Sequence, residues 1–359
     1  MPIVEDETRV RNSVRSAVPE RMYVFCGTEP YLKEHYLQTL ISSCVAQGFE
    51  LFNLKKFDGS QTSIREILAA ADQAPLMTGR NCVVVRDFSF ASINSSDCEY
   101  LKEYVARVPD STVLVFFQND ADFPPKLSRD EAAEGEDEKG VKKQRKELFD
   151  AISKYAFIAR LNKLPQQRLV NLLVNGAKRR GSALSAQNAA YMVDCCGDSL
   201  YNLMNELDKV CAFAAGGEVS RETIDRLVTK TLEATVFEIT DNLFAGRVDK
   251  ALTALEILLF QRTAAQMIMG TLISAFVNIY RVRLAEKARK TNAELMKDFG
   301  LSSAYYIDKL RSSSRRLTGE GIRKCLEILD EADTALKSRG GSENIILEET
   351  VVKLGAVLR

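Results

Sequence analysis

The hydrophobic pattern of this chain of 359 residues changes near residue 160. Before that point, runs that are apolar at every position, such as CVVV at 82–85 and VLVFF at 113–117, alternate with stretches of helical spacing. An uninterrupted apolar run predicts a strand covered on both faces, as strands are in a parallel sheet between helices. Beyond Pro165 no convincing strand follows. The pattern therefore predicts an α/β region followed by an all-α region.

The α/β region is expected to contain five strands, separated mostly by helices. We predict the strands at Met22–Cys26, Leu51–Phe57, Asn81–Asp87, Thr112–Gln118 and Phe157–Arg160. Helices are expected at 30–47, 62–74 and 97–106. The whole chain is longer than the roughly 250–300 residues that one hydrophobic core usually supports, so we expect two or three domains.

Residues 127–146 differ from the rest of the α/β region because they are charged and almost free of apolar side chains. Six acidic residues fall within 130–138 and five basic residues within 139–146. This composition predicts a solvated insertion that runs into a charged helix, with 134–139 without fixed structure. A phosphate-binding role for its basic residues is the alternative, and the neighbouring acids disfavour it.

The all-α region begins with four short helices that suggest a small bundle. They are predicted at Gln166–Arg180, Ser185–Asp194, Ser199–Ala215 and Ser220–Val228. Ser185 is a typical helix N-cap, and the glycines at 181 and 216–217 are typical of helix ends. A second helical block runs from about Glu233 to residue 359.

Within this second block, Thr263–Tyr280 carries no charged residue and is nearly long enough to span a membrane. Polar and small residues recur in it at steps of three or four, which places them in one stripe along a helix. The stripe consists of Thr263, Gln266, Gly270, Ser274 and Asn278. We therefore expect a mostly buried bundle helix with one polar seam and no membrane contact.

Residues 281–316 carry ten basic and four acidic residues. A basic stripe can follow a nucleic-acid backbone, because each phosphate contact releases counterions. The candidate DNA contacts are Arg281, Arg283, Arg311, Arg315 and Arg316. An ordinary solvated helix surface is the alternative, since only Tyr305 and Tyr306 accompany the charges and no base-reading motif is present.

The composition excludes most side-chain catalysis. His35 is the only histidine, it lies in a predicted amphipathic helix, and we expect it to be a surface or packing residue. The eight cysteines contain no C-x-x-C pair, so a structural zinc site is not expected. No catalytic or metal-binding residue is predicted. The N-terminus lacks the apolar segment of a signal peptide, and scattered cysteines then favour a cytoplasmic protein with reduced thiols.

A strand, a glycine turn and a helix at the start of a parallel sheet invite comparison with a phosphate-binding loop. That loop needs several glycines, a lysine for the phosphates and a hydroxyl for Mg²⁺. Here Gly27 stands alone, Pro30 removes one N–H, Glu29 and Glu34 add negative charge, and no Gly-Lys pair occurs in the chain. Lys33 is expected to be a surface lysine. We predict no nucleotide cofactor.

Four segments in a fixed order carry a family resemblance. They are YVFCGTEPYLKEHYLQTL (23–40), FDGSQTSIREILAAADQAPLMTGRNCVVVRDF (57–88), residues 160–210 around NAAYMVDCCGDSLYNLMNELDKV, and FEITDNLFAGRVDKALTALEILL (237–259). The chain resembles the delta subunits of the bacterial DNA polymerase III clamp loader, a family of the AAA+ type.

The resemblance implies three domains: an AAA+-like α/β domain at 1–160, a small helical lid at 161–232 and a helical collar at 233–359. It implies a subunit that binds the sliding clamp, called beta, and opens one of its interfaces for loading onto primed DNA, without hydrolysing ATP. The expected partners are the clamp, primed DNA, and the tau/gamma and delta-prime subunits of a hetero-pentamer. Tyr201 stands where active relatives place an arginine against the γ-phosphate.

The family's clamp-binding element lies between the second helix and the third strand. In this chain that segment is Gln73-Ala74-Pro75-Leu76-Met77. It is similar to the general pattern of Gln, two spacers, Leu and a large apolar residue, with Met77 where Phe is commoner. The resemblance thus assigns clamp binding to Gln73, Pro75, Leu76 and Met77. The alternative is that Leu76 and Met77 cover the domain's own core.

Three other functions remain open at this point. Another loader subunit, delta-prime or of the tau/gamma type, is the first, although the missing phosphate loop and zinc cluster oppose the tau/gamma type. The second is an active ATPase of another kind. The third is a stand-alone DNA-binding helical protein, which would bind DNA with a steep salt dependence.

Overall fold

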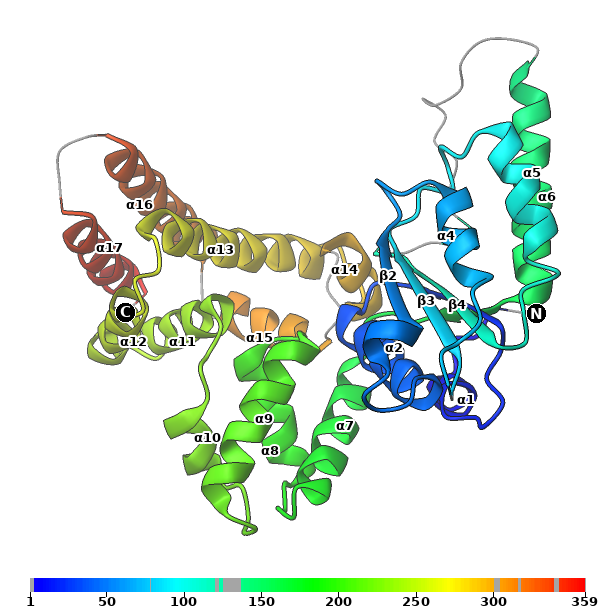
Figure 1. Cartoon of the computed structure of the whole chain (residues 1–359). Coiled ribbons are helices and arrows are strands. Elements are labelled where there is room, and N and C mark those ends of the chain that lie inside the picture. The colour runs from blue at the N-terminus through cyan, green and yellow to red at the C-terminus, as the bar shows by residue number, and fades with distance from the viewer. Residues whose placement is uncertain are drawn as a thin grey trace. The chain divides into compact units, whose positions relative to one another are not determined.

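The computed structural model describes residues 3–77, 79–119, 123–124, 137–299, 304–315, 318–338 and 342–358. Contacts within the chain divide it into two compact units, Met1–Lys163 and Leu164–Arg359. Figure 1 shows both units.

The first unit is built on a parallel five-stranded sheet in the order β2-β3-β4-β1-β5. The strands are β1 (Met22–Cys26), β2 (Leu54–Asp58), β3 (Asn81–Arg86), β4 (Thr112–Phe117) and β5 (Phe157–Arg160). Its helices are α1 (Glu7–Val14), α2 (Pro30–Cys44), α3 (Glu50–Asn53), α4 (Ile64–Ala71), α5 (Ser95–Tyr104) and α6 (Asp137–Tyr155).

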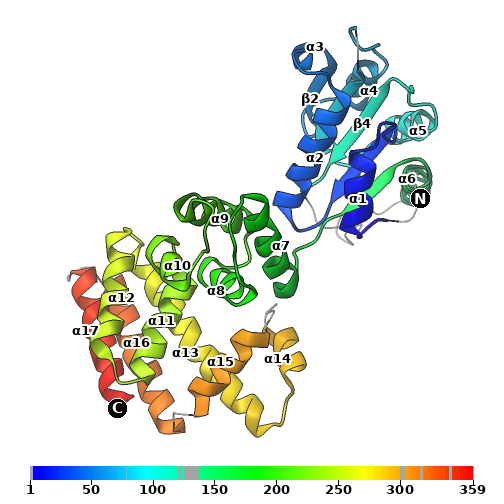
Figure 2. The ribbon, with the colours of Figure 1, turned by 90° about the horizontal axis from the view of Figure 1, so that it is seen from below.

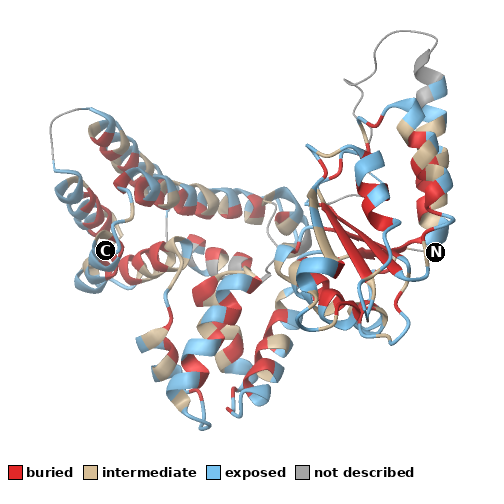
Figure 3. Cartoon of the chain, viewed as in Figure 1, coloured by how far each residue is buried: buried red, intermediate tan, exposed pale blue. Residues whose placement is uncertain are grey.

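The core of this unit explains why the apolar runs are continuous. Every residue of β1 and β4 is buried, because helices cover both faces of the sheet (Figure 3). One face packs against α4, α5 and α6, with Leu68, Leu101 and Ile152 fully buried. Helix α2 contacts β1 and β3, and α1 packs on α2. A parallel sheet between helical layers is the predicted arrangement.

Residues 3–20 contribute to this unit. Val4 extends the sheet beside β5, since its N–H donates to the Ile158 carbonyl (2.8 Å) and its carbonyl accepts from the Arg160 N–H (2.9 Å). Helix α1 follows, with Asp6 as its N-cap.

The predicted strand at Leu51–Phe57 is wrong at its start. Residues 50–53 form the one-turn helix α3, and β2 begins only at Leu54. The turn is held locally, because the Asn53 N–H donates to the Phe49 carbonyl (2.9 Å) and the Gly48 N–H donates to the Glu50 carboxylate (2.9 Å). Residues 127–136 of the charged stretch lie outside the described residues, and α6 takes up its second half. The expectation of no fixed structure at 134–139 is wrong for 137–139, which belong to α6.

The second unit is helical throughout the part that the structure describes. Its first helices are α7 (Gln166–Arg179), α8 (Ala186–Cys196), α9 (Leu200–Ala214) and α10 (Arg221–Leu227). The remaining helices are α11 (Leu232–Phe244), α12 (Val248–Phe260), α13 (Ala265–Lys287), α14 (Asn292–Phe299), α15 (Ala304–Arg315), α16 (Gly319–Lys337) and α17 (Glu343–Val357). Figure 2 shows α7 to α10 gathered together, and α8 contacts α11. The predicted caps are present: Ser185 Oγ, for example, accepts from the Asn188 N–H (3.1 Å).

Helix α13 is the one described helix that is long and apolar enough, by length and composition, to cross a membrane. A core helix of a bundle satisfies the same criteria. Its residues Ile268, Leu272 and Phe276 are fully buried in a core shared with α11, α12, α16 and α17. The predicted polar stripe lies on the opposite side, where Gln266, Gly270 and Ser274 are exposed. The packing agrees with the expected bundle helix and its polar seam. The expectation that the helix is mostly buried is wrong, because 39% of its most apolar stretch is buried.

Candidate functional site

All strands of a parallel sheet begin at one edge and end at the opposite edge. The candidate site lies at the edge where β2 and β3 begin. The two strands are neighbours, and Leu54 pairs with Cys82. Because parallel neighbours start at the same edge, the residues before Leu54 lie beside the residues before Asn81. The edge therefore brings together α3 and the loop that follows α4, which is the segment that the resemblance assigned to the clamp.

Asn53 joins these two segments. Its side chain is 1% exposed, its Nδ2 donates to the Leu76 carbonyl (3.1 Å), and its Oδ1 accepts from the Leu76 N–H (2.7 Å). A buried amide with both groups satisfied is stable, whereas an unmatched one would cost free energy. The side chain thus binds Leu76 as a neighbouring strand would and fixes the backbone of the loop.

Both ends of the loop are also held. At the start, Asn81 Nδ2 donates to the carbonyls of Ala70 and Gln73 (2.9 Å each). At the end, the Arg80 N–H donates to the Cys44 carbonyl (2.9 Å). Gly79 has φ of 93°, and a Cβ there would lie 2.9 Å from the Cys44 carbonyl oxygen, so only glycine fits. Residues 73, 79 and 80 are thus held on either side of Leu76 and Met77.

The side chains of this loop point outward. Leu76 is 47% exposed and Met77 is 79% exposed, so the alternative that they cover the domain's own core does not agree with the structure. Pro75 is half-buried. The Gln73 amide oxygen accepts from Lys55 Nζ, which also donates to the Ala70 carbonyl (3.1 Å). Partial burial lowers the pKa of Lys55 below its ordinary value.

Two further exposed apolar residues at this edge were missed by the sequence analysis. Leu51 is 94% exposed and Phe52 is 58% exposed, and both belong to α3. The run LFNLKKF fits an edge strand equally well, which explains the wrong assignment. One feature of the sequence could have indicated exposed residues here, namely the adjacent pair Leu51-Phe52. In a strand, one of two adjacent side chains would point to each face of the sheet.

At the opposite edge lies the turn after β1, where a phosphate-binding loop would be located. In this chain the residues of that turn make contacts that stabilise the fold. Gly27 has φ of 106°, and a Cβ there would lie 2.2 Å from the Leu161 carbonyl oxygen. This glycine therefore permits a close approach between the segments that leave β1 and β5. The Glu29 carboxylate accepts from the Tyr31 N–H (3.0 Å) and caps α2.

Lys33 was predicted to be a surface residue, and that prediction is wrong. It is 2% exposed, and its Nζ donates to the carbonyls of Gln118 (2.9 Å) and Asn119 (3.3 Å) just after β4. The ring of Phe117 lies 5.5 Å from the same nitrogen. A buried ammonium group needs such partners. In a phosphate-binding loop the lysine would donate to a phosphate, whereas here Lys33 donates to backbone carbonyl groups of the chain.

The second unit contains a pocket of about 970 Å³ between α8, α9 and α11. Acidic residues outnumber basic ones in its lining: Asp194, Asp198, Asp225, Glu233, Glu238 and Asp241 face Arg221, Lys230 and Arg247. A nucleotide triphosphate would meet repulsion there. Tyr201, in the first turn of α9, is 44% exposed. Among the described residues, no group of three His, Cys, Asp or Glu side chains could hold a metal ion.

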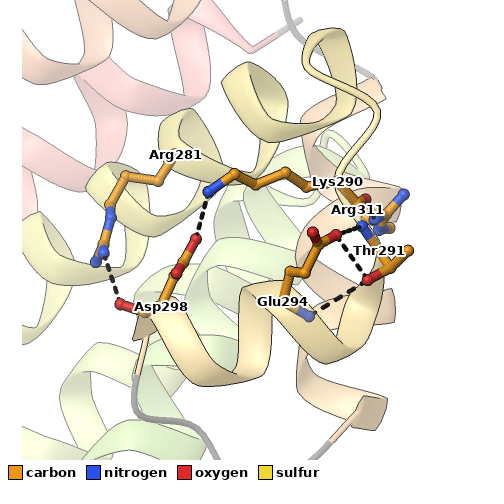
Figure 4. Close-up of polar contacts among 6 residues, drawn as sticks. All are labelled: Arg281, Lys290, Thr291, Glu294, Asp298 and Arg311. Carbon is orange, nitrogen blue, oxygen red and sulfur yellow. Dashed lines mark hydrogen bonds and ion pairs between the residues drawn. The ribbon is translucent and has the colours of Figure 1, made fainter.

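The candidate DNA-contacting arginines mostly hold α13, α14 and α15 together (Figure 4). Arg281 donates to the Asp298 carbonyl (3.3 Å) and lies 4.0 Å from the ring of Phe299. Arg311 donates to the Lys290 carbonyl (2.8 Å). Lys290 Nζ in turn pairs with the Asp298 carboxylate (2.6 Å).

The remaining arginines divide into two groups. Arg283 donates to the Ser314 carbonyl (2.8 Å) and is part of the same set of contacts between helices. Arg315 is 73% exposed, although its Nε lies 3.4 Å from Glu286. Arg316 lies outside the described residues. DNA contact stays a prediction, and Arg315 is the described arginine whose exposure suits it best.

Two family models match the chain. One, described as DNA polymerase III, delta subunit, matches residues 23–128. The other, described as the C-terminal domain of the DNA polymerase III delta subunit, matches residues 233–354. Together they cover well over half of the sequence. The chain belongs to the delta-subunit family of DNA polymerase III.

Relatives along the whole chain agree with this membership. DNA polymerase III subunit delta of Bacillus subtilis is 21% identical over 352 residues, which are 96% of each chain. The probable delta subunit of Aquifex aeolicus is 22% identical over 327 residues, 89% of this chain and 86% of its own. The solved clamp loader delta protein YqeN of Bacillus subtilis superposes with a TM-score of 0.66 at 20% identity, covering 97% of this chain and 99% of that one.

The comparisons confirm the family and the fold class that the sequence predicted. They do not test the predicted site residues or the division into three domains. The boundary between the two compact units falls at 163/164, close to the predicted end of the α/β domain, and the predicted lid and collar lie within the second unit.

We predict that Asn53→Ala releases the loop. Losing two hydrogen bonds of a buried amide should lower the free energy of unfolding by about 1–3 kcal/mol, measured by urea denaturation with circular dichroism. The Leu76 amide should exchange with solvent much faster than in the unaltered chain.

Asn81→Ala is the matched control, because Asn81 holds the start of the loop and does not touch Leu76. It should also destabilise the unit, yet leave the Leu76 amide protected. Equal protection of Leu76 in the Asn53→Ala variant and the unaltered chain would contradict the proposed fixation.

Proposed function

We propose that this chain binds the DNA sliding clamp through Leu76 and Met77 and opens one clamp interface for loading onto primed DNA, without hydrolysing ATP itself. The observation that carries the proposal is an exposed apolar pair on a loop whose backbone is fixed by a buried amide. Membership of the delta-subunit family supports the choice of partner.

The geometry suits insertion into an apolar pocket. Burying a Leu or Met side chain contributes roughly 1.5–3 kcal/mol, and a thioether adapts to an irregular pocket. Because Asn53 already fixes the backbone, binding needs little further ordering of the loop. This chain can shift the clamp toward the open state only if it binds the open clamp more tightly than the closed clamp. A rigid apolar projection can supply such a difference.

The proposed absence of ATP hydrolysis is supported by the chemistry of the opposite edge. Lys33 is engaged with carbonyl groups of the chain, and Glu29 places a carboxylate in the turn after Gly27. Neither Gly27 nor Lys33 is arranged to hold a phosphate. This supports a structural role for the AAA+-like domain and opposes an active ATPase.

Assembly with the tau/gamma and delta-prime subunits is proposed to use the helices from 233 onward. Several large apolar residues are exposed there, among them Phe260 at 90% and Met267 at 60%, on either side of the turn between α12 and α13. Exposed apolar groups of this kind mark subunit contacts. Such a complex would act on primed DNA in the cytoplasm.

Leu76→Ala combined with Met77→Ala should weaken clamp binding by about two to four orders of magnitude, at about 1.4 kcal/mol per tenfold. The melting temperature should stay unchanged, because both side chains are exposed. Surface plasmon resonance with the isolated clamp measures the affinity. Phe213→Ala, an exposed aromatic on α9, is the control.

The same variants test clamp opening. Unaltered chain should release clamp rings from circular DNA, and the double variant should not. A large loss of melting temperature with unchanged affinity of the folded protein would refute the proposed role of the loop.

Isothermal titration with Mg-ATP should show no binding at millimolar nucleotide, because phosphate groups find no glycine-rich loop and no accessible lysine. A dissociation constant in the low micromolar range would overturn this prediction and favour an active ATPase.

Phe260→Ala combined with Met267→Ala should reduce co-elution with the other loader subunits in size-exclusion chromatography. Clamp affinity should be unaffected, because the first unit is unchanged, and Phe213→Ala again serves as the control. Full co-elution of the double variant would show that assembly uses a different surface.

A further inference from the structure

The one-turn helix α3 exposes a second apolar pair at the edge that carries the proposed clamp loop. Leu51 and Phe52 do not belong to the core of the first unit, and their exposed fractions of 94% and 58% are unusual for such residues. Soluble proteins rarely leave contiguous large apolar groups exposed unless a partner covers them. The fold does not require the pair, so its presence calls for a binding role.

The two apolar pairs are held in a fixed relation. Phe52 is followed by Asn53, whose side chain binds the backbone of Leu76 at both N–H and C=O. The pairing of β2 with β3 fixes the strands that follow each segment. The segment before α3 is tied in as well, since the Arg80 N–H donates to the Cys44 carbonyl. Leu51 and Phe52 therefore cannot move independently of Leu76 and Met77.

The area that a stable interface needs points to one partner for both pairs. A specific protein interface buries about 800 Å² on each side, and the side chains of Leu76 and Met77 supply only part of it. A partner that covers this loop must extend over neighbouring residues. The neighbour joined to the loop by Asn53 is α3, and it offers apolar groups.

We propose that Leu51 and Phe52 form a second anchor for the same sliding-clamp subunit that receives Leu76 and Met77. The inference rests on the proposed function. The binding surface then has two parts, with Asn53 as the positioning residue between them. Its apolar centre is larger than the sequence pattern of the family indicates.

The experiment measures the equilibrium affinity of the full chain for the isolated clamp by surface plasmon resonance. Leu51→Ala combined with Phe52→Ala should weaken binding by at least about 100-fold, with the melting temperature unchanged. Phe213→Ala is the control, and Leu76→Ala with Met77→Ala is measured in parallel. If the double variant at α3 is less stable, Leu51→Gln replaces it, because that side chain is almost fully exposed and its loss leaves the fold intact.

The outcomes separate the two proposals. Weakening by both double variants, with Phe213→Ala unchanged, supports the second anchor. Weakening by the loop variant alone overturns the second anchor and leaves the proposed function standing. No clamp binding by the unaltered chain overturns both. Unchanged clamp affinity with loss of co-elution with the loader subunits assigns α3 to another subunit, and also overturns the inference.

Discussion

The parallel pairing of β2 with β3 is the interaction on which the candidate site depends. Parallel strands start at one edge of the sheet and end at the other, so segments that are more than twenty residues apart in sequence become neighbours. At the starting edge this brings α3 beside the loop before β3. At the ending edge it brings the turn after β1 beside the residues after β4. The first edge exposes apolar side chains, and the second is filled by the chain's own polar contacts.

Buried polar side chains determine what each edge can bind. Asn53 satisfies both backbone groups of Leu76 and leaves the side chains of the loop facing outward. At the other edge, Lys33 donates to two carbonyl groups after β4. Its ammonium group is therefore bound to the chain itself and is not presented to a phosphate. Both residues are nearly fully buried, so their polar partners are a condition of stability as well as of function. The same requirement, that buried polar groups be hydrogen-bonded, therefore leaves Leu76 and Met77 exposed at one edge and directs Lys33 to backbone carbonyls at the other.

The sequence predicted the sheet because β1, β3 and β4 are largely apolar runs, and it located helices such as α8 and α9 because serines cap them. It misplaced the start of β2, because a run with adjacent apolar residues fits an edge strand as well as one turn of helix. It also placed Lys33 on the surface, since no sequence signal reports that two carbonyl groups lie within reach. The arginines at 281, 283 and 311 looked like a nucleic-acid surface, whereas contacts that form only in the folded bundle engage them. The proposed role of Leu76 and Met77 came from family resemblance, and their exposure came from the structure.

The backbone of Met77 bears on the proposed binding by this loop. Its φ of 62° is a left-handed conformation that costs a non-glycine residue roughly 1–2 kcal/mol. The surrounding contacts maintain this conformation: Asn53 on Leu76, the Cys44 carbonyl on Arg80, and glycine at 79, where a Cβ would collide. Because the unbound chain already bears that strain, a partner does not have to impose it. An apolar pair held outward in this way retains most of its burial free energy for the complex, where a flexible loop would lose part of it to ordering.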